Sequence, residues 1–281
     1  MIVFLNGTFV PEEQALVSVF DRSFLYGDGL FEAVRVAAGK PFRWEQHMQR
    51  LQRGAQFLRI SLPLPPEALR EAATELLSRN GVADALLRIT LSRGIGLRGY
   101  SPKGADQPTL VMSSHPVPPF DPLNPARWRL ITASFRLPAN ESLAEFKTCN
   151  KLPQVLARAE ADAAGADEAL LLNTDGFIVE GASSNLFWID DHAVYTSPLA
   201  SGVLAGVTRA TVFEICRGLG WAVREASVTP DELRRSQAVF LSLSSIGIAQ
   251  ILSLDGHSLG QSPLLPTLRT AYWDLVRAET Q

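Results

Sequence analysis

The proline-rich segment HPVPPFDPLNP, residues 115–125, limits how this 281-residue chain can fold more than any other feature. Proline fixes φ and lacks a backbone N–H, so such a segment suits neither a helix nor an interior strand. No apolar periodicity crosses it, and we interpret it as a linker. The chain is long enough for two modest domains. We therefore predict one domain over residues 1–117 and another over residues 118–281.

The region before the linker predicts an antiparallel sheet with two helices, that is, an α+β unit. Hairpin turns are expected where glycine interrupts alternating apolar residues. Helices are expected where apolar residues recur at helical spacing, or where proline and Asn-Gly mark the two ends. The predicted elements are turns at Asn6-Gly7 and Gly39-Lys40, helices over 44–58 and 65–79, and strands over 85–92 and 109–114.

The region after the linker predicts strands joined by tight turns and flanked by helices. This pattern is typical of a mostly antiparallel β domain. The predicted strands are 128–135, 168–172, 177–180, 185–189, 192–196, 222–227 and 238–243. The predicted helices are 152–164, 207–219, 230–235 and 265–277.

Composition and charge exclude several classes of function. The formal net charge of −3 gives no reason to expect a nucleic-acid partner. The opening residues lack the pattern of a signal peptide, and no stretch approaches the ~18 apolar residues of a membrane span. The only cysteines are Cys149 and Cys216, so no disulfide framework is expected. We predict a cytoplasmic protein with neither nucleic-acid nor membrane partners.

Gly94, Gly96 and Gly99 match the pattern G-x-G-x-x-G after a predicted strand. A dinucleotide site also needs a helix that opens at the third glycine. The residues that follow, GYSPKGADQP, cannot begin one. We predict a glycine-rich loop between two strands instead.

The four histidines show no metal-ligand spacing among themselves or with cysteine. They are His47, His115, His192 and His257. We predict no metal site, and we expect His47 to be a partly exposed surface residue of a helix.

Lysine is rare in this chain, with 22 arginines but only Lys40, Lys103, Lys147 and Lys151. Where charge alone is needed the chain uses arginine, so a lysine in apolar surroundings suggests that an amine is required. Lys147 follows an apolar residue just before a helix, where burial would lower its pKa and suit it to a Schiff base. Lys151 is the competitor, expected to face solvent. Taken singly, an ordinary surface lysine is the better interpretation.

Glu180 and two anion-binding candidates follow Lys147. Glu180 ends the apolar run FIVE, where a carboxylate is costly without a cationic partner such as a pyridinium nitrogen. The helix opening after Gly206 offers backbone N–H groups and the Thr208 hydroxyl to an anion. Ser244 and Ser245 end another strand and could also bind phosphate. A strand-end glutamate, an ordinary helix cap and a polar turn are the alternatives.

Together these segments resemble the class IV, or fold-type IV, pyridoxal-5'-phosphate (PLP) enzymes. That family includes branched-chain aminotransferases, D-amino-acid aminotransferases and 4-amino-4-deoxychorismate lyases. The resemblance covers nearly the whole chain in the right order, so the alternatives for single residues become untenable together. It rests on DRSFLYGDGLFEAVRV (21–36), HMQRL (47–51), Lys147, EALLLNTDGFIVEGASSNLFWI (168–189) and GVTR (206–209).

The resemblance implies a small α/β domain and a larger pseudo-barrel domain, with PLP in the cleft between them. Lys147 would carry PLP as a Schiff base and move the proton at the substrate's Cα. Glu180 would keep the pyridine nitrogen protonated, and Arg50 would bind the phosphate. The resemblance also implies that the phosphate is bound by Val207, Thr208 and Ser244. It implies that Ser245 lies beside Ser244, toward the substrate.

The loop SRGIGLRGYSP, residues 92–102, resembles the corresponding loop of aminodeoxychorismate lyases. The resemblance implies a homodimer in which Arg98 and Tyr100 bind a substrate carboxylate in the neighbouring subunit's site. D-amino-acid aminotransferases carry histidine in place of Tyr100 and tyrosine in place of Phe31, which is also a predicted substrate-binding residue. Branched-chain aminotransferases tend to have glycine, and many lyases threonine, in place of Ala33.

We therefore predict a lyase that eliminates pyruvate from aminodeoxychorismate to give 4-aminobenzoate, for folate biosynthesis. The alternative is a transaminase acting on branched-chain or D-amino acids with 2-oxoglutarate as amino acceptor. A catalytically silent protein of the same fold is a third possibility, which the intact Lys147, Glu180 and Arg50 argue against. A nucleotide-binding protein that uses the glycine-rich loop is the fourth.

Overall fold

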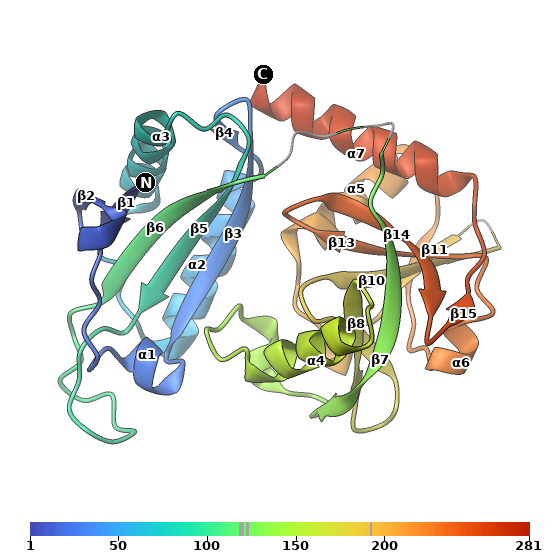
Figure 1. Ribbon diagram of the computed structural model, residues 1–281, viewed down its shortest axis with the longest axis horizontal. Helices are drawn as coiled ribbons and strands as arrows, with labels where there is room; N and C mark the ends of the chain where they lie inside the picture. The colour runs from blue at the N-terminus through green and yellow to red at the C-terminus, as the bar shows by residue number, and fades with distance from the viewer. Residues whose placement is uncertain (118–120, 122–123, 192) are drawn as a thin grey trace. The chain divides into compact units, whose positions relative to one another are not determined.

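A computed structural model describes residues 1–117, 121, 124–191 and 193–281. They form two compact units (Figure 1). The first comprises Met1–Pro119, Phe146–Lys151 and Val276–Gln281, and the second comprises Phe120–Glu145 and Leu152–Leu275. The predicted boundary after residue 117, much of the predicted linker and His192 fall on residues outside the described part. The boundary therefore stays a prediction.

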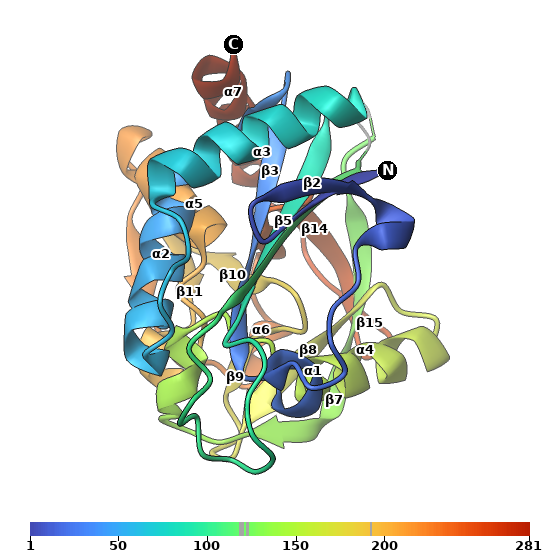
Figure 2. The ribbon, with the colours of Figure 1, turned by 90° about the vertical axis from the view of Figure 1, so that its left-hand side faces the viewer.

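The first unit is a six-stranded sheet with two long helices packed on it (Figure 2). Its strand order is β2-β1-β6-β5-β3-β4, and every pair is antiparallel. The strands are β1 (Ile2–Leu5), β2 (Thr8–Pro11), β3 (Gly29–Ala37), β4 (Lys40–Pro41), β5 (Ala85–Ser92) and β6 (Thr109–Pro116). The helices are α1 (Arg22–Tyr26), α2 (Trp44–Leu58) and α3 (Pro66–Asn80), with a short 3-10 helix over Glu12–Gln14. The predicted α+β arrangement of this region is confirmed.

Two hairpin turns position the strands of this sheet. Asn6 (φ 48°) and Gly7 (φ 92°) both have positive φ, as a two-residue hairpin turn requires, and they lie where predicted. The second turn lies one residue earlier than predicted, at Ala38 (φ 49°) and Gly39 (φ 77°). The reason is that Lys40 already pairs with the end of β3.

The second unit is built on a nine-stranded sheet of order β12-β11-β10-β13-β14-β7-β8-β9, with β15 paired to β14. Its strands are β7 (Arg127–Leu137), β8 (Glu168–Asn173), β9 (Ile178–Gly181), β10 (Asn185–Asp190), β11 (Ala193–Thr196), β12 (Val223–Glu225), β13 (Ala238–Leu243), β14 (Gly247–Leu254) and β15 (His257–Ser258). Its helices are α4 (Leu152–Ala163), α5 (Val207–Gly218), α6 (Pro230–Leu233) and α7 (Leu264–Thr280), with 3-10 helices over Ser142–Glu145 and Leu199–Ser201. The last residues of α7 belong to the first unit.

Most described pairs in this sheet are antiparallel, as predicted, but β7 runs parallel to β8 and β14, and β11 runs parallel to β12. A parallel pair needs a crossover connection, usually a helix. Helix α4 connects β7 to β8, and α5 connects β11 to β12. The sequence predicts both helices but not their role as crossovers, and it does not predict α1, β14 or β15.

No helix in the described part of the chain combines the length and the apolar character needed to span a membrane.

Candidate active site

Lys147 is held by the sheet of the first unit. The N–H of Phe31 donates to the carbonyl of Lys147 at 2.9 Å, and the N–H of Cys149 donates to the carbonyl of Gly29 at 2.9 Å. These bonds fix the backbone on both sides of the lysine. Its ammonium lies 4.5 Å from the centroid of the Phe31 ring. Lys151, which we expected to face solvent, is half-buried.

Arg50, the predicted phosphate ligand, is paired with a buried carboxylate. Glu32 accepts hydrogen bonds from Arg50 Nε at 2.8 Å and from Arg50 Nη2 at 2.6 Å. Nδ1 of His47 lies 2.7 Å from Oε2 of Glu32. Burial raises the pKa of Glu32, but the charges and hydrogen bonds of Arg50 and His47 outweigh it and bring the pKa to about 2. The ionised Glu32 therefore fixes the plane of the Arg50 guanidinium.

The expected surface position of His47 is wrong, because this side chain is 2% exposed. It lies on α2, which packs against β3. Burial lowers the pKa of His47, the charges of Arg50 and Lys147 lower it further, and Glu32 only partly offsets them. Helical spacing placed His47 on a helix but could not show that a carboxylate on the sheet would satisfy it.

Arg88, on β5, is a candidate that sequence reasoning missed. Its guanidinium carbon lies 4.1 Å from the centroid of the Phe31 ring, which Lys147 also approaches. Burial lowers its pKa, and Cys149 partly offsets this. No carboxylate in the described part of the chain pairs with Arg88. The available signal was an arginine inside the otherwise apolar strand ALLRITLS, opposite Ala33 in the sheet.

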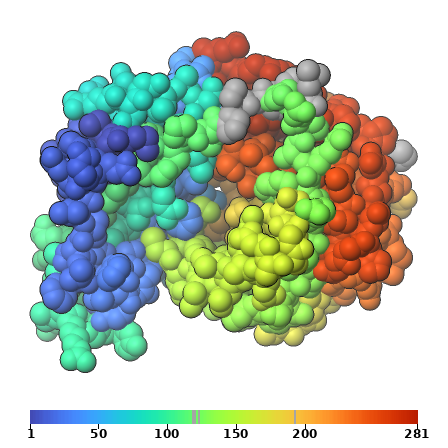
Figure 3. Space-filling model, viewed as in Figure 1, coloured from blue at the N-terminus to red at the C-terminus, as the bar shows by residue number. Residues whose placement is uncertain are grey.

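Arg98 and Tyr100 belong to the loop between β5 and β6. This loop forms part of the surface of the first unit (Figure 3, lower left). Tyr100 is 86% exposed, and Arg98 is exposed as well. β5 and β6 pair antiparallel from end to end, and the glycine-rich segment forms no helix. The predicted loop is confirmed, and the arrangement is not that of a dinucleotide-binding βαβ unit.

In the second unit, Glu180 is held in place by β10 and the segment before α5. Its Oε2 accepts from Asn185 Nδ2 at 3.1 Å and from the N–H of Leu204 at 3.1 Å. Asn185 Nδ2 also donates to the carbonyl of Leu204 at 2.9 Å. A Cβ at Gly206 would lie 2.0 Å from Asn185 Oδ1, so only glycine fits where the chain enters α5.

The N-terminus of α5 lies next to this cluster. No side chain caps it, and Val207 and Thr208 are buried there. Such an end presents unpaired N–H groups and favours an anion. Ser242 stands opposite Asn185 in the sheet. Its buried hydroxyl and that of Ser184 have no hydrogen-bond partner among the described residues.

Ser244 and Ser245 form the turn between β13 and β14, just beyond Ser242, and both are half-buried. The turn therefore ends the strand where the sequence predicts it. A carboxylate, an uncapped helix end and several hydroxyls are grouped in this unit. Unsatisfied buried hydroxyls are uncommon, and they are consistent with a polar ligand at this position. The donor set suits a phosphorylated heterocycle with a basic nitrogen.

Residues 29–254 match the family model described as Amino-transferase class IV. This span contains most of the chain, including Lys147, Arg50 and Glu180. The chain belongs to the class IV aminotransferase family. It is therefore an enzyme, and it has the mixed α/β architecture of fold-type IV that the sequence predicts.

Relatives within the family carry different names. The chain is 36% identical to the “Putative branched-chain-amino-acid aminotransferase” of Methanocaldococcus jannaschii over 92% of this chain and 89% of that protein. It is 32% identical to the aminodeoxychorismate lyase of Vibrio harveyi over 85% of this chain and 87% of that protein. Among solved structures, the branched-chain aminotransferase of Thermoproteus uzoniensis with norvaline superposes with a TM-score of 0.92 at 30% identity, covering 100% of this chain and 96% of that chain.

The cofactor of this class IV enzyme is PLP, as the sequence predicts, and similar solved structures include a branched-chain aminotransferase with pyridoxamine 5'-phosphate. The described residues include no cluster of histidine, cysteine and carboxylate side chains that could hold a metal ion. Both cysteines are free. Phe31, Arg50 and Lys147 lie in the first unit, whereas Glu180, Val207, Thr208, Ser244 and Ser245 lie in the second.

Proposed function

We propose that the chain is a PLP-dependent aminotransferase that exchanges the amino group of branched-chain amino acids with 2-oxoglutarate. The observation that supports an anionic substrate in this proposal is the position of Arg88. Its guanidinium and the Lys147 ammonium approach the same Phe31 ring, and no described carboxylate pairs with Arg88. A partly desolvated guanidinium on this ring favours a substrate anion there. Glutamate and 2-oxoglutarate each bring a second carboxylate that would meet this need.

The residues of both units take complementary roles in this proposal. PLP supplies an electron sink for the carbon that loses its proton. Lys147 holds the cofactor and moves the proton at the substrate's Cα. Arg50 and the α5 N-terminus bind the phosphate, and Glu180 keeps the ring nitrogen protonated. That all of them meet in one site is part of the proposal.

A lyase that forms 4-aminobenzoate is the second candidate. It is favoured by the loop segment GLRGYS and by the similarity to the Vibrio harveyi lyase. The partly buried Arg88 suits either substrate, because aminodeoxychorismate is also a carboxylic acid. The higher identity to a protein named as an aminotransferase supports placing transamination first.

We also propose a homodimer, on the basis of an exposed apolar patch in the first unit. Asp21 and Ile95 form an antiparallel bridge, which brings the segment 16–25 beside the loop 95–100. Large contiguous exposed apolar patches are rare on monomeric proteins. Its exposed members are Leu16, Val17, Val19, Phe20, Phe24, Leu25, Ile95, Leu97 and Tyr100. A cytoplasmic location is retained as a proposal, since both cysteines are free.

One pair of assays tests the choice of reaction. The purified holoenzyme is incubated with 2-oxoglutarate and L-leucine, L-valine or D-alanine, and glutamate is measured. A second sample receives aminodeoxychorismate, and 4-aminobenzoate is measured. The proposal expects glutamate with the L-branched-chain substrates. Formation of 4-aminobenzoate with no glutamate would replace it by the lyase, and glutamate from D-alanine alone would replace it by a D-amino-acid aminotransferase.

A further inference from the structure

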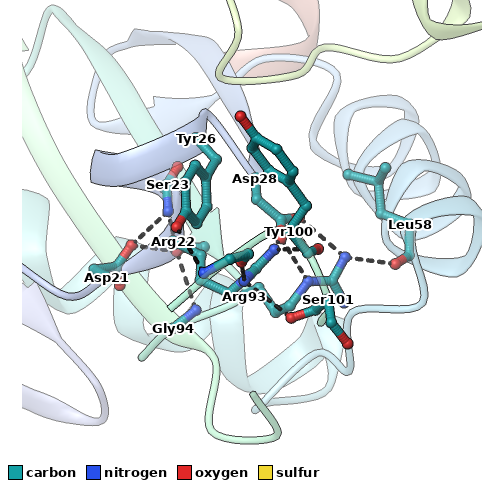
Figure 4. A network of polar contacts seen from close by, with 12 residues as sticks. Asp21, Arg22, Ser23, Tyr26, Asp28, Leu58, Arg93, Gly94, Tyr100 and Ser101 are labelled. Carbon is teal, nitrogen blue, oxygen red and sulfur yellow. Dashed lines mark hydrogen bonds and ion pairs between the residues drawn. The ribbon is translucent and has the colours of Figure 1, made fainter. Parts of the chain in front are cut away.

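The loop that carries Arg98 and Tyr100 is held by one buried arginine, Arg22 (Figure 4). Arg22 Nη1 donates to the carbonyl of Gly99 at 2.9 Å and to the carbonyl of Ser101 at 3.1 Å, and Nη2 donates to the carbonyl of Tyr100 at 3.0 Å. The side chain is 3% exposed. A planar guanidinium with five donors can bind these three carbonyls and a carboxylate together, whereas a lysine ammonium has only three donors on one atom.

Arg22 is itself fixed by a carboxylate. Its Nε donates to Asp28 Oδ2 at 2.8 Å, and Asp28 accepts two further bonds from Arg93, at 2.8 and 3.0 Å. Arg93 in turn donates to the carbonyls of Leu58 and Arg59 at the end of α2. Burial raises the pKa of Asp28, but the hydrogen bonds and charges of Arg93 and Arg22 outweigh it and hold that pKa below its usual value. Asp28 is therefore a permanent anchor near neutral pH.

Tyr26 adds a second attachment to the same loop. Its hydroxyl accepts from the N–H of Gly99 at 3.2 Å, and its ring packs edge-on against the ring of Tyr100 with centroids 5.5 Å apart. Arg22 lies 5.0 Å from the centroid of the Tyr26 ring. A Cβ at Gly96 would lie 2.9 Å from Arg22 Cδ, so the loop packs closely on the arginine. The backbone on both sides of Gly99 is thus tied to α1, while Arg98 stays exposed.

We propose that Arg22 is a positioning residue: by binding the carbonyls of Gly99, Tyr100 and Ser101, it sets where Arg98 and Tyr100 meet the substrate. This rests on the proposed function and on the carboxylate-binding role that the family resemblance implies for Arg98 and Tyr100. Arg22 touches neither substrate nor cofactor in this scheme. It acts on substrate affinity through the loop.

Arg22→Lys tests the proposal, because it keeps the positive charge but has too few donors to bind Asp28 and all three carbonyls at once. We expect KM for the substrate to rise about ten- to a hundredfold, since a misplacement of about 1 Å can cost about 10²-fold. kcat at saturation and the PLP spectrum should change little. Arg35→Lys is the matched control, because Arg35 is another buried arginine paired with an aspartate, Asp84, at 2.8 Å. An unchanged KM in a folded Arg22→Lys enzyme would overturn the proposal.

A second measurement needs no activity. Trypsin can cut after Arg98, and Arg22→Lys leaves the number of trypsin sites unchanged. We expect faster cleavage at the Arg98–Gly99 bond in Arg22→Lys, and in the milder Tyr26→Phe, than in wild type or Arg35→Lys. Equal cleavage rates would show that the arginine does not hold the loop. Arg98→Ala tests the carboxylate-binding role separately. If it leaves KM unchanged while Arg22→Lys speeds cleavage, Arg22 holds the loop but the loop does not bind the substrate carboxylate, and the proposal is overturned.

Discussion

The carboxylate of Glu32 accepts two hydrogen bonds, of 2.8 and 2.6 Å, from the guanidinium of Arg50 inside the first unit. Both side chains are buried, at 0% and 5% exposed. Breaking either half of such a pair leaves a buried charge without its partner, which is costly. The pair therefore links cofactor binding, proposed for Arg50, to the stability of the first unit.

Arg50→Ala should weaken PLP binding. The lost contact is charge-assisted and worth roughly 1.5–3 kcal/mol, which corresponds to on the order of ten- to a hundredfold in Kd. Titration of apoenzyme with PLP, followed by absorbance, gives the measurement. Arg53→Ala, at an exposed position of the same helix, is the control. Equal dissociation constants for the two variants would contradict the assigned role.

Glu32→Gln should destabilise the protein most at neutral pH. The folded-state pKa of Glu32, about 2, lies below its ordinary 4.5. A carboxylate whose pKa is lower in the folded state stabilises the fold at pH values above its ordinary pKa. That stabilisation is lost as the pH falls toward the folded-state pKa. The free energy of unfolding should therefore differ from wild type by about 3 kcal/mol or more at pH 7. This difference in unfolding free energy should be smaller at pH 3, and urea titrations at both pH values measure it. A difference that does not change with pH would contradict an ionised Glu32 in the folded protein.

Arg88→Leu should impair the half-reaction in which glutamate or 2-oxoglutarate, each with two carboxylates, is the substrate. Removal of the cation should raise KM for 2-oxoglutarate on the order of tenfold or more, since one charge-assisted contact is worth roughly 1.5–3 kcal/mol. KM for L-leucine, whose side chain carries no charge, should change less. Steady-state kinetics with each substrate varied give the comparison, and Arg88→Lys should recover part of the loss. Equal rises for both substrates would mean that Arg88 serves the structure alone.

Borohydride treatment of the holoenzyme should attach the cofactor to Lys147. Its backbone is fixed by β3 and its ammonium approaches Phe31. Peptide mapping by mass spectrometry identifies the modified lysine. Lys151 is the main competitor, being nearby and half-buried. Cofactor found on Lys151, Lys40 or Lys103 would displace the central assignment.

A shared site predicts complementation between two inactive chains. Arg98→Ala and Lys147→Ala homodimers should each be inactive at low substrate. A heterodimer would keep one of its two sites with both residues intact, so about half of wild-type activity per dimer is expected by counting sites if each site works alone. Affinity tags of two kinds allow heterodimers to be isolated and assayed. Verified heterodimers without activity would place Arg98 in its own subunit's site, or in none.

Local signals in the sequence predicted most elements, because each depends on neighbouring residues. Asn6-Gly7 supplies the positive φ of a hairpin turn, and Gly81 ends α3 in the left-handed region at φ 62°. Strand β14 was not predicted, although it carries apolar residues. The only turn signal recognised before it was the pair Ser244 and Ser245. The parallel pairing of β7 with β8 and β14 depends on contacts distant in sequence, and local patterns do not encode it.

The candidate site was predicted in part through resemblance and in part missed for physical reasons. Lys147, Arg50 and Glu180 stood out as parts of recognisable segments. Arg88 did not, because its importance comes from its contact with the Phe31 ring, which Lys147 also approaches, and Phe31 lies far from both residues in the sequence. His47 was misplaced for the same reason: only the fold brings Glu32 to it.

The last residues of α7 belong to the first unit, where Glu279 pairs with Arg43 at 3.0 Å. A ribosome that adds about 5–20 residues per second makes them roughly ten to thirty seconds after residue 117. Until then the nascent sheet lacks this contact, and until residues 146–151 are made it also lacks the Lys147 segment that pairs with β3. A recombinant fragment limited to residues 1–117 would lack them permanently and is a poor choice for expression.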